Sequence, residues 1–262
     1  MRPLSSLSDT TTSLNRLELI TISALSPLYW SEVYEAIRAI MHYNRAMDCE
    51  ASRVANRLAY DAMLQGRFIA IQDICSLLKG KSVCIAGGSE SLIRQLGALN
   101  ECERIIAADG ASMFLLENSI DPDIVVSDLD GPWAYLLKAS QHGAYMVVHV
   151  HGDNIPAVKH LAPMFKKIAL TTQCPTDYSY FSLLPGFTDG ERAIGLALIC
   201  GAASIVLAGM RTWERVGYWS KPWLSSSVKP WTEKKRKLSI AEFFIQLFSL
   251  YAKENGVKWQ RL

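Results

Sequence analysis

The chain has 262 residues, half of them apolar, and a formal net charge of +2. This length and composition are sufficient for a full hydrophobic core and predict a globular protein. The small net charge gives no support for a nucleic-acid or membrane partner. There is also no export signal at the N-terminus and no run of about 18 apolar residues that could span a membrane. We therefore expect a cytoplasmic protein.

Six cysteines stand at positions 49, 75, 84, 102, 174 and 200, with no CxxC pair and mostly apolar neighbours. This distribution is typical of reduced cysteines packed in a core. It argues against a disulfide framework or a zinc ribbon. We expect free thiols, in agreement with a location in the cytosol.

The predicted elements begin with helices. Residues 1–13 are rich in serine and threonine and have no apolar period, so they predict a mobile lead-in without an assigned function. From Ser31, a possible N-cap, to about Leu64, apolar residues recur at spacings of three and four. This spacing predicts two helices or one long bent helix. We expect residues 1–66 to form a helical N-terminal extension and residues 67–262 to form an α/β domain.

Strands and helices alternate in the rest of the chain. The β-rich run 81–86 precedes a glycine turn and a helical run at 92–99. The alternation continues with helix 134–141, strand 144–150, helix 155–164, strand 167–172, a turn and helix within 186–200, and strand 203–207. It predicts a parallel, Rossmann-like sheet with helices on both faces. A long loop at 210–230, an amphipathic helix from Lys234 and a possible edge strand at 257–262 complete the chain.

The glycine turn after the first strand contains Gly87, Gly88 and Ser89. Glycines at such a position can bring backbone amides close to an anion, as phosphate-binding turns do. A plain tight turn explains the same residues about equally well. The three residues are therefore candidates for nucleotide binding, with the tight turn as the alternative.

Aspartates close two of the apolar runs. Asp109 follows the run 105–108, and Asp128 and Asp130 follow the run 124–126. The carboxyl ends of parallel strands meet at one edge, and residues two apart on an extended chain point the same way, so all three carboxylates can face one crevice. Crowded carboxylates need a cation between them, and hard oxygen ligands favour magnesium. Magnesium in turn suggests a phosphate substrate.

His149, His151 and Asp153 alternate at the end of a later predicted strand, so all three could project into the same crevice. A zinc hydrolase is the alternative for this HxHxD pattern. The additional aspartates make an oxygen-rich site, which favours magnesium over zinc. For His149, which is nearer the strand interior, a buried histidine that orients a carboxylate is favoured over a metal ligand.

Thr188, Asp189 and Arg192 stand at a junction between a turn and a helix. Asp189 could cap the helix, or it could bind a metal or a substrate. Arg192 could hold a phosphate with two hydrogen bonds, or it could form a surface ion pair. The acidic residues elsewhere favour the functional interpretation. The run Lys234–Lys237 is most simply a solvated face, although one of its cations could neutralise a triphosphate.

Four motifs, AADGA, PDIVVSDLDG, HVHGDN and GFTDGERA, follow one another along the chain. In order and separation they resemble the archaeal MptE-like 6-hydroxymethyl-7,8-dihydropterin pyrophosphokinases and, more distantly, the thiamine pyrophosphokinases. The resemblance spans about Lys81 to Leu250. It implies magnesium-dependent transfer of the β,γ-diphosphate of ATP to the hydroxymethyl group of a pterin, with release of AMP. ATP and a pterin would be the partners, and a homo-oligomer is possible.

The resemblance also implies roles for individual residues and makes 67–262 the catalytic domain. The expected metal ligands are Asp109, Asp128, Asp130, Asp153 and Asp189. The expected catalytic residues are Asp128, Asp130, Asp153, Asp189 and Arg192. The expected nucleotide- and substrate-binding residues include the glycine turn described above. The full set is Gly87, Gly88, Ser89, Asp109, Gly110, His151, Asn154 and Thr188.

The sequence departs from the family pattern at Arg211, where an acid is expected, and mildly at Glu191. Two alternatives for the function stay open. The segment SDLDGP also resembles the nucleophile strand of haloacid-dehalogenase phosphatases, with Asp128 as nucleophile, although here two strand-like runs precede it. The second alternative is a nucleotide-binding module without turnover.

Overall fold

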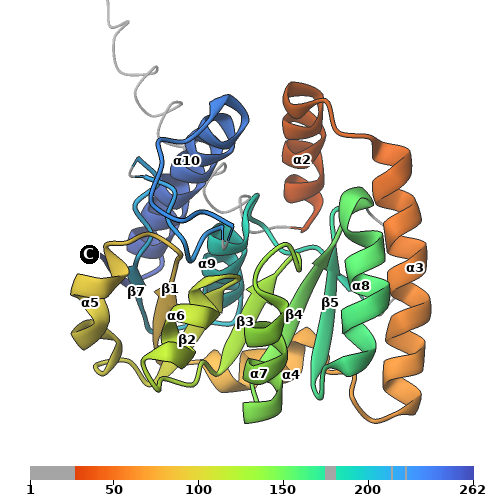
Figure 1. The fold of residues 1–262 in the computed structure, drawn as a ribbon, viewed down its shortest axis with the longest axis horizontal. Coiled ribbons are helices and arrows are strands. Elements are labelled where there is room, and N and C mark those ends of the chain that lie inside the picture. Colours follow the sequence, from red (N-terminus) through yellow and green to blue (C-terminus); the bar gives the residue numbers. More distant parts are fainter. Residues whose placement is uncertain (1–26, 175–180, 214, 222) are drawn as a thin grey trace, which may run out of the picture.

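The computed structural model describes residues 27–174, 181–213, 215–221 and 223–262, so the expected lead-in at 1–13 lies outside it. Eight strands form one sheet in the order β6-β5-β4-β3-β2-β1-β7-β8 (Figure 1). They are β1 (Ser82–Ala86), β2 (Arg104–Ala108), β3 (Ile124–Ser127), β4 (Tyr145–Val150), β5 (Ile168–Thr172), β6 (Phe181–Ser182), β7 (Ser204–Ala208) and β8 (Lys258–Arg261). Every pairing is parallel, so the predicted parallel α/β fold is confirmed.

The helices are α2 (Pro27–Met41), α3 (Arg45–Leu64), α4 (Ile71–Leu78), α5 (Leu92–Leu99), α6 (Ala111–Glu117), α7 (Trp133–His142), α8 (Ile155–Leu161), α9 (Asp189–Ile199) and α10 (Thr232–Glu254), with 3-10 turns η1 (Gly152–Asn154) and η2 (Ala162–Met164). Between residues 27 and 66, which the structure describes, the N-terminal region forms two helices, and the first begins ahead of Ser31. Asn44 separates them, because its side chain accepts hydrogen bonds from two amides of the first turn of α3. No helix within the described ranges has the length and apolar character of a membrane span.

The sheet is buried on both faces, which explains why its strands appear as nearly continuous apolar runs. Along β1, Val83 and Ile85 belong to one hydrophobic core, and Cys84 and Ala86 belong to the other. Helices α2, α4, α9 and α10 pack into the first core, and α3, α5, α6, α7 and α8 pack into the second (Figure 1).

The N-terminal helices take part in both cores. Trp30 of α2 makes an edge contact with Phe244 of α10 at 5.2 Å between ring centroids. Helix α3 buries a stripe of small residues, Ala51, Ala55, Ala59 and Ala62, above the other face of the sheet. The two helices are therefore tied to the α/β part by packing, and the domain boundary at residue 66 stays a prediction.

The expectation of free thiols is wrong. The six cysteines form three disulfides, Cys49–Cys174, Cys75–Cys200 and Cys84–Cys102. In the first two, the partners lie 125 residues apart in the sequence. Parallel crossovers bring the paired segments together in the fold, so neither the spacing nor the neighbours of these cysteines could indicate the pairing.

Strand β8 is an edge strand, as the sequence predicts. It pairs with β7, and a charged contact ties it to α10. Arg261 donates one hydrogen bond to each carboxylate oxygen of Glu242, at 2.9 and 2.8 Å, and a further one to the Met210 carbonyl at 2.6 Å. The hydrogen bonds from Arg261 lower the pKa of Glu242 from 4.5 to about 2. Because the folded-state pKa is depressed, the stabilisation is fully present above pH 4.5 and is lost as the pH falls towards 2.

We expect Glu242→Gln to lower the free energy of unfolding at pH 7 by up to about 3 kcal/mol, because the charged partner of Arg261 is lost. The difference from the wild type should shrink steadily below pH 4.5. Urea denaturation between pH 7 and pH 3 measures both quantities. Glu254→Gln, at an exposed position near the end of the same helix, should change stability by less than about 0.5 kcal/mol. A pH-independent difference between Glu242→Gln and the wild type would contradict this account.

Candidate active site

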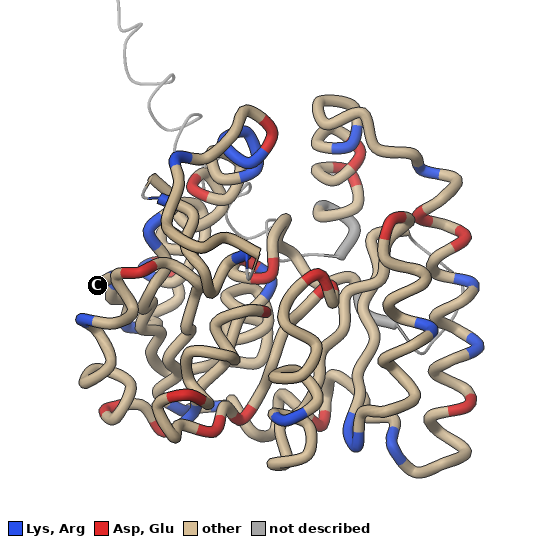
Figure 2. The backbone as a smooth tube through the Cα atoms, in the orientation of Figure 1, with Lys and Arg blue, Asp and Glu red and all other residues tan. Residues whose placement is uncertain are grey.

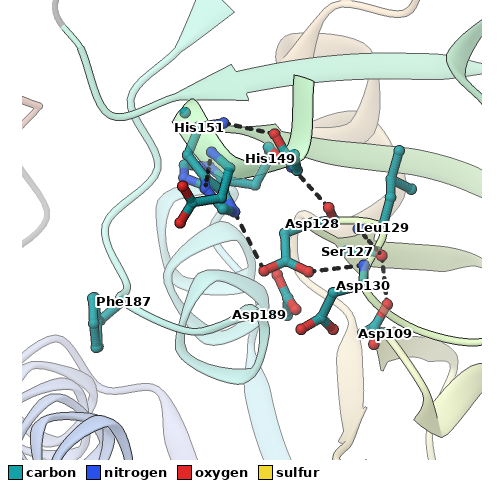
Figure 3. Close-up of polar contacts among 12 residues, drawn as sticks. Asp109, Ser127, Asp128, Leu129, Asp130, His149, His151, Phe187 and Asp189 are labelled. Carbon is teal, nitrogen blue, oxygen red and sulfur yellow. Dashed lines mark hydrogen bonds and ion pairs between the residues drawn. The ribbon is translucent and has the colours of Figure 1, made fainter. Parts of the chain in front are cut away.

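The aspartates that follow β2 and β3 converge as predicted. One carboxylate oxygen from each of Asp109, Asp128 and Asp130 lies within 4.8 Å of the others (Figure 3). The carboxylates of Asp128 and Asp130 do not converge through the alternation of side chains along a strand, as we expected. Leu129 has a φ of 66°, and the Asp130 amide donates a hydrogen bond to Asp128 Oδ1 at 3.2 Å. A left-handed turn after β3 therefore turns both carboxylates to the same side.

Asp109 is fixed at the base of this cluster. Its Oδ1 accepts a hydrogen bond from the Ser127 hydroxyl at 2.6 Å, and its φ is 43°. A β-carbon at Gly131 would lie 2.3 Å from its Oδ2, which explains the glycine of the DLDG motif. Burial and the neighbouring Asp128 and Asp130 carboxylates raise the pKa of Asp109 to about 7. A bound cation would relieve this repulsion, so the residues present fit a metal ion with hard-oxygen ligands.

Asp128 lies between a histidine and a second acid. His151 Nε2 is 3.6 Å from Asp128 Oδ2. Burial by itself would raise the pKa of Asp128, but the interactions with His151 and Arg192 outweigh it and hold that pKa below its usual value. Figure 3 shows the Asp189 carboxylate beside Asp128 and Asp130. Burial, with Asp128 nearby, raises the pKa of Asp189 well above its usual value.

Arg192 is a buried part of the site, so the alternative of a surface ion pair is wrong. It is 3% exposed and donates hydrogen bonds to Asp189 Oδ1 at 3.1 Å and to the Phe187 carbonyl at 2.9 Å. Its Nε atom is buried without a hydrogen-bond partner. Thr188 donates through its amide and its hydroxyl to Glu191, at 2.7 and 2.9 Å, which closes the first turn of α9. The Asp189 and Arg192 side chains are therefore held in place by the helix N-terminus.

The residues after β4 have different environments. His149 is buried, with Nδ1 3.0 Å from the Thr171 hydroxyl, and burial lowers its pKa well below 6.5. Asn154 lies beneath the acidic cluster and donates hydrogen bonds to the carbonyls of Asp128 and His149, both at 2.7 Å. Asp153 is exposed, because β4 ends at Val150 and the turn η1 interrupts the strand alternation. It lines the same cavity but is not one of the three grouped carboxylates.

The glycine turn after β1 has a packing explanation. The amides of Gly87 and Ser89 donate hydrogen bonds to the carbonyls of Ala208 and Gly209, at 2.8 and 3.0 Å. A β-carbon at Gly87 would lie 2.6 Å from the Gly209 carbonyl oxygen. The close approach of the chain after β7 therefore requires this glycine. The tight-turn alternative accounts for the turn, although Gly87, Gly88 and Ser89 also line the cavity.

A cavity of about 580 Å³ lies at the carboxyl edge of the sheet and contains the acidic cluster. Two of its walls come from segments outside the four motifs; of these residues, only those of the Lys234–Lys237 run were considered as candidates from the sequence. The α2–α3 region contributes Tyr34, His42, Tyr43, Asn44, Met47 and Asp48, and the loop after β7 together with α10 contributes Lys221, Lys234 and Lys237. In the sequence, the aromatic residues had the periodicity of core positions, and nothing distinguished Lys221 from other loop residues.

The lysines of the second wall face the carboxylates. Lys221 is 9% exposed, and its ammonium group contacts the Asp130 carboxylate. Lys234 is close enough to Lys221 and Asp130 to sense both charges, and burial together with Lys221 lowers its pKa. Figure 2 shows the basic residues at the start of α10. The cavity thus has carboxylates at the strand ends and ammonium groups opposite them.

The region 63–212 matches the family model described as 6-hydroxymethylpterin diphosphokinase MptE-like. Three curated relatives are named 6-hydroxymethyl-7,8-dihydropterin pyrophosphokinase. The chain is 38% identical to that of Pyrococcus furiosus, over 87% of this chain and 94% of the relative. It is 42% identical to that of Methanothermobacter thermautotrophicus, over 59% and 67%, and 31% identical to that of Methanocaldococcus jannaschii, over 82% and 92%. The chain therefore belongs to the MptE-like 6-hydroxymethylpterin diphosphokinase family.

Proposed function

We propose that the protein transfers the β,γ-diphosphate of ATP to the hydroxymethyl group of 6-hydroxymethyl-7,8-dihydropterin and releases AMP. The observation that carries this proposal is the meeting of Asp109, Asp128 and Asp130 within 4.8 Å in a cavity that is also lined by the buried Lys221 and by Lys234. That arrangement suits a metal-bound triphosphate. The names of the curated relatives support the choice of ATP and a pterin as substrates.

Magnesium fits this donor set better than zinc, because the three grouped ligand atoms are all carboxylate oxygens. Asp109, Asp128 and Asp130 would hold the ion directly. Asp189, which lies beside them, and Asp153, at the cavity surface, would complete the coordination directly or through water. When bound, magnesium neutralises phosphate charge and polarises the phosphorus that is attacked.

The residues of the chain position the reactants. Diphosphate transfer leaves little covalent chemistry to the protein, so most of the rate comes from alignment and charge neutralisation. In our proposal, Lys221 and Lys234 neutralise the triphosphate from the side opposite the carboxylates. Arg192 has a free Nε donor in the cavity wall and steadies a phosphate oxygen. His151 lies next to Asp128 and accepts the proton of the acceptor hydroxyl.

The decisive experiment is incubation with ATP, magnesium and 6-hydroxymethyl-7,8-dihydropterin, followed by chromatography of the nucleotides. We expect AMP and a pterin whose mass has increased by a diphosphate group. ADP would indicate a monophosphate kinase. ATP binding without any product would favour the non-catalytic module. Family membership argues against the haloacid-dehalogenase type of phosphatase, and a phosphoaspartate at Asp128, detected by mass spectrometry, would overturn our proposal in its favour.

A further inference from the structure

The N-terminal helices are fixed to the catalytic edge of the sheet by direct bonds. The buried Asp48 carboxylate accepts hydrogen bonds from the Tyr34 hydroxyl at 2.8 Å and from the Gly152 amide at 2.9 Å. A β-carbon at Gly152 would lie 2.5 Å from the β-carbon of Met47, so α3 rests directly on η1. The disulfide Cys49–Cys174 ties α3 to the segment after β5. This wall of the cavity is therefore rigidly placed.

Gln173 lies under this wall, immediately after β5. Its side chain lines the cavity and is 6% exposed, and its Oε1 is buried without a hydrogen-bond partner. Leaving a buried amide oxygen unpaired costs on the order of 1–3 kcal/mol, so such an atom in a native protein calls for an explanation. A ligand that donates a hydrogen bond to Gln173 would supply the missing partner.

Two aromatic residues from the segments that precede α3 and α9 also line the cavity. Tyr43 and Phe187 both line it, and their rings are stacked with centroids 6.3 Å apart and planes inclined by 28°. Aromatic faces of this kind bind flat heterocycles by stacking. Lys221 and Lys234 belong to the wall formed by the β7–α10 loop and α10. Lys237 of α10 places its ammonium group 5.8 Å from the centroid of Tyr43, so the aromatic residues adjoin this cationic wall.

We propose that Gln173, together with Tyr43 and Phe187, forms the subsite for the flat heterocyclic ring of the acceptor alcohol, an inference that rests on the proposed function. A primary amide pairs with a ring edge that carries an N–H donor next to an acceptor, as the amino-oxo edge of a pterin does. Gln173 follows β5 and Asp128 follows β3, so they are separated by two strand spacings, or roughly 10 Å. A bicyclic ring held at Gln173 therefore presents its hydroxymethyl group to the carboxylate cluster.

Calorimetric titration with 6-hydroxymethylpterin, without ATP, tests the subsite directly. We expect Gln173→Leu to weaken pterin binding at least about tenfold, because the hydrogen bonds to the ring edge are lost. Affinity for ATP in the presence of magnesium should not change. Gln173→Leu should also be at least as stable as the wild type, because it removes an unsatisfied buried atom. Gln72→Ala, at an exposed position on α4, should match the wild type in both titrations.

Unchanged pterin affinity in Gln173→Leu, or a wild type that does not bind the pterin, would overturn the inference. Equal weakening of pterin and ATP binding would also overturn it, because that would indicate a general structural role. A parallel assay of AMP formation separates this inference from the proposed function. Pterin binding that depends on Gln173 without AMP formation would refute only the proposed reaction. AMP formation with an unaltered pterin KM in Gln173→Leu would refute only the subsite.

Discussion

Asp128→Asn and Asp130→Asn are each expected to lower the rate of AMP formation at least about a hundredfold, because each removes one charge from the proposed metal site. The melting temperature should change little. In Asp130→Asn the loss of the contact with Lys221 is offset by weaker repulsion among the three grouped carboxylates, whereas Asp128→Asn should lower the melting temperature slightly, because His151 and Arg192 stabilise the charged form of Asp128. Steady-state kinetics and a thermal melt of each variant measure the two effects.

Asp61→Asn is a matched control, because Asp61 lies on α3 and does not line the catalytic cavity. It should keep the wild-type rate. A variant at position 128 or 130 that retains more than about a tenth of the wild-type rate would argue against its role in holding the metal. A large drop in melting temperature would instead assign the residue to the stability of the fold.

Gly110→Ala is the second change for which we expect a large effect. A β-carbon at Gly110 would lie 1.7 Å from the carbonyl oxygen of Trp219, so the loop that carries Lys221 must move away. The backbone itself accepts alanine, because Gly110 has a φ of −62°. We expect a loss of about 1–3 kcal/mol in unfolding free energy from overpacking. The rate of AMP formation should fall at least about tenfold, because Lys221 loses its position at Asp130.

Tryptophan fluorescence provides an independent measurement, since Trp219 packs edge-on against Phe114 with ring centroids 4.8 Å apart. The emission of Gly110→Ala should shift as this contact is lost. Gly97→Ala is the control, because a β-carbon at this position in α5 meets no atom within 4 Å. It should leave activity unchanged and add about 0.5–1 kcal/mol of stability. Full activity and unaltered fluorescence in Gly110→Ala would refute the proposed position of the loop.

The parts of the fold that were predictable from sequence are those with local signals. The acids at 109, 128 and 130 follow short apolar runs, and this local pattern placed them correctly at the sheet edge. Helix α6 was missed because almost every one of its residues is buried, so its sequence has no amphipathic period. The exposure of Asp153 was also not predicted, because an alternating pattern does not show where strand β4 ends and the η1 turn begins.

The rest of the site depends on contacts between distant parts of the sequence. Lys221 and Asp130 are 91 residues apart, and Asp48 and Gly152 are 104 residues apart. Neither contact has a signature in the neighbouring sequence, because the crossovers of the parallel sheet and the path of a long loop bring these residues together. The unpaired oxygen of Gln173 could be recognised only in the structure, because hydrogen bonding cannot be inferred from residue type.

The family model matches residues 63–212, whereas part of the cavity wall comes from the α2–α3 region before it and from the β7–α10 loop and α10 after it. The carboxylates, Gln173 and Phe187 lie inside the matched region, whereas Tyr43, Lys221 and Lys234 lie outside it. Substitutions in the terminal segments can therefore reshape the cavity wall while the carboxylate cluster stays in place. The α2–α3 segment is attached to the sheet edge through the Asp48–Gly152 hydrogen bond and the Cys49–Cys174 bridge. Family members could therefore exchange this segment as one unit, and with it the part of the cavity wall that contacts the acceptor.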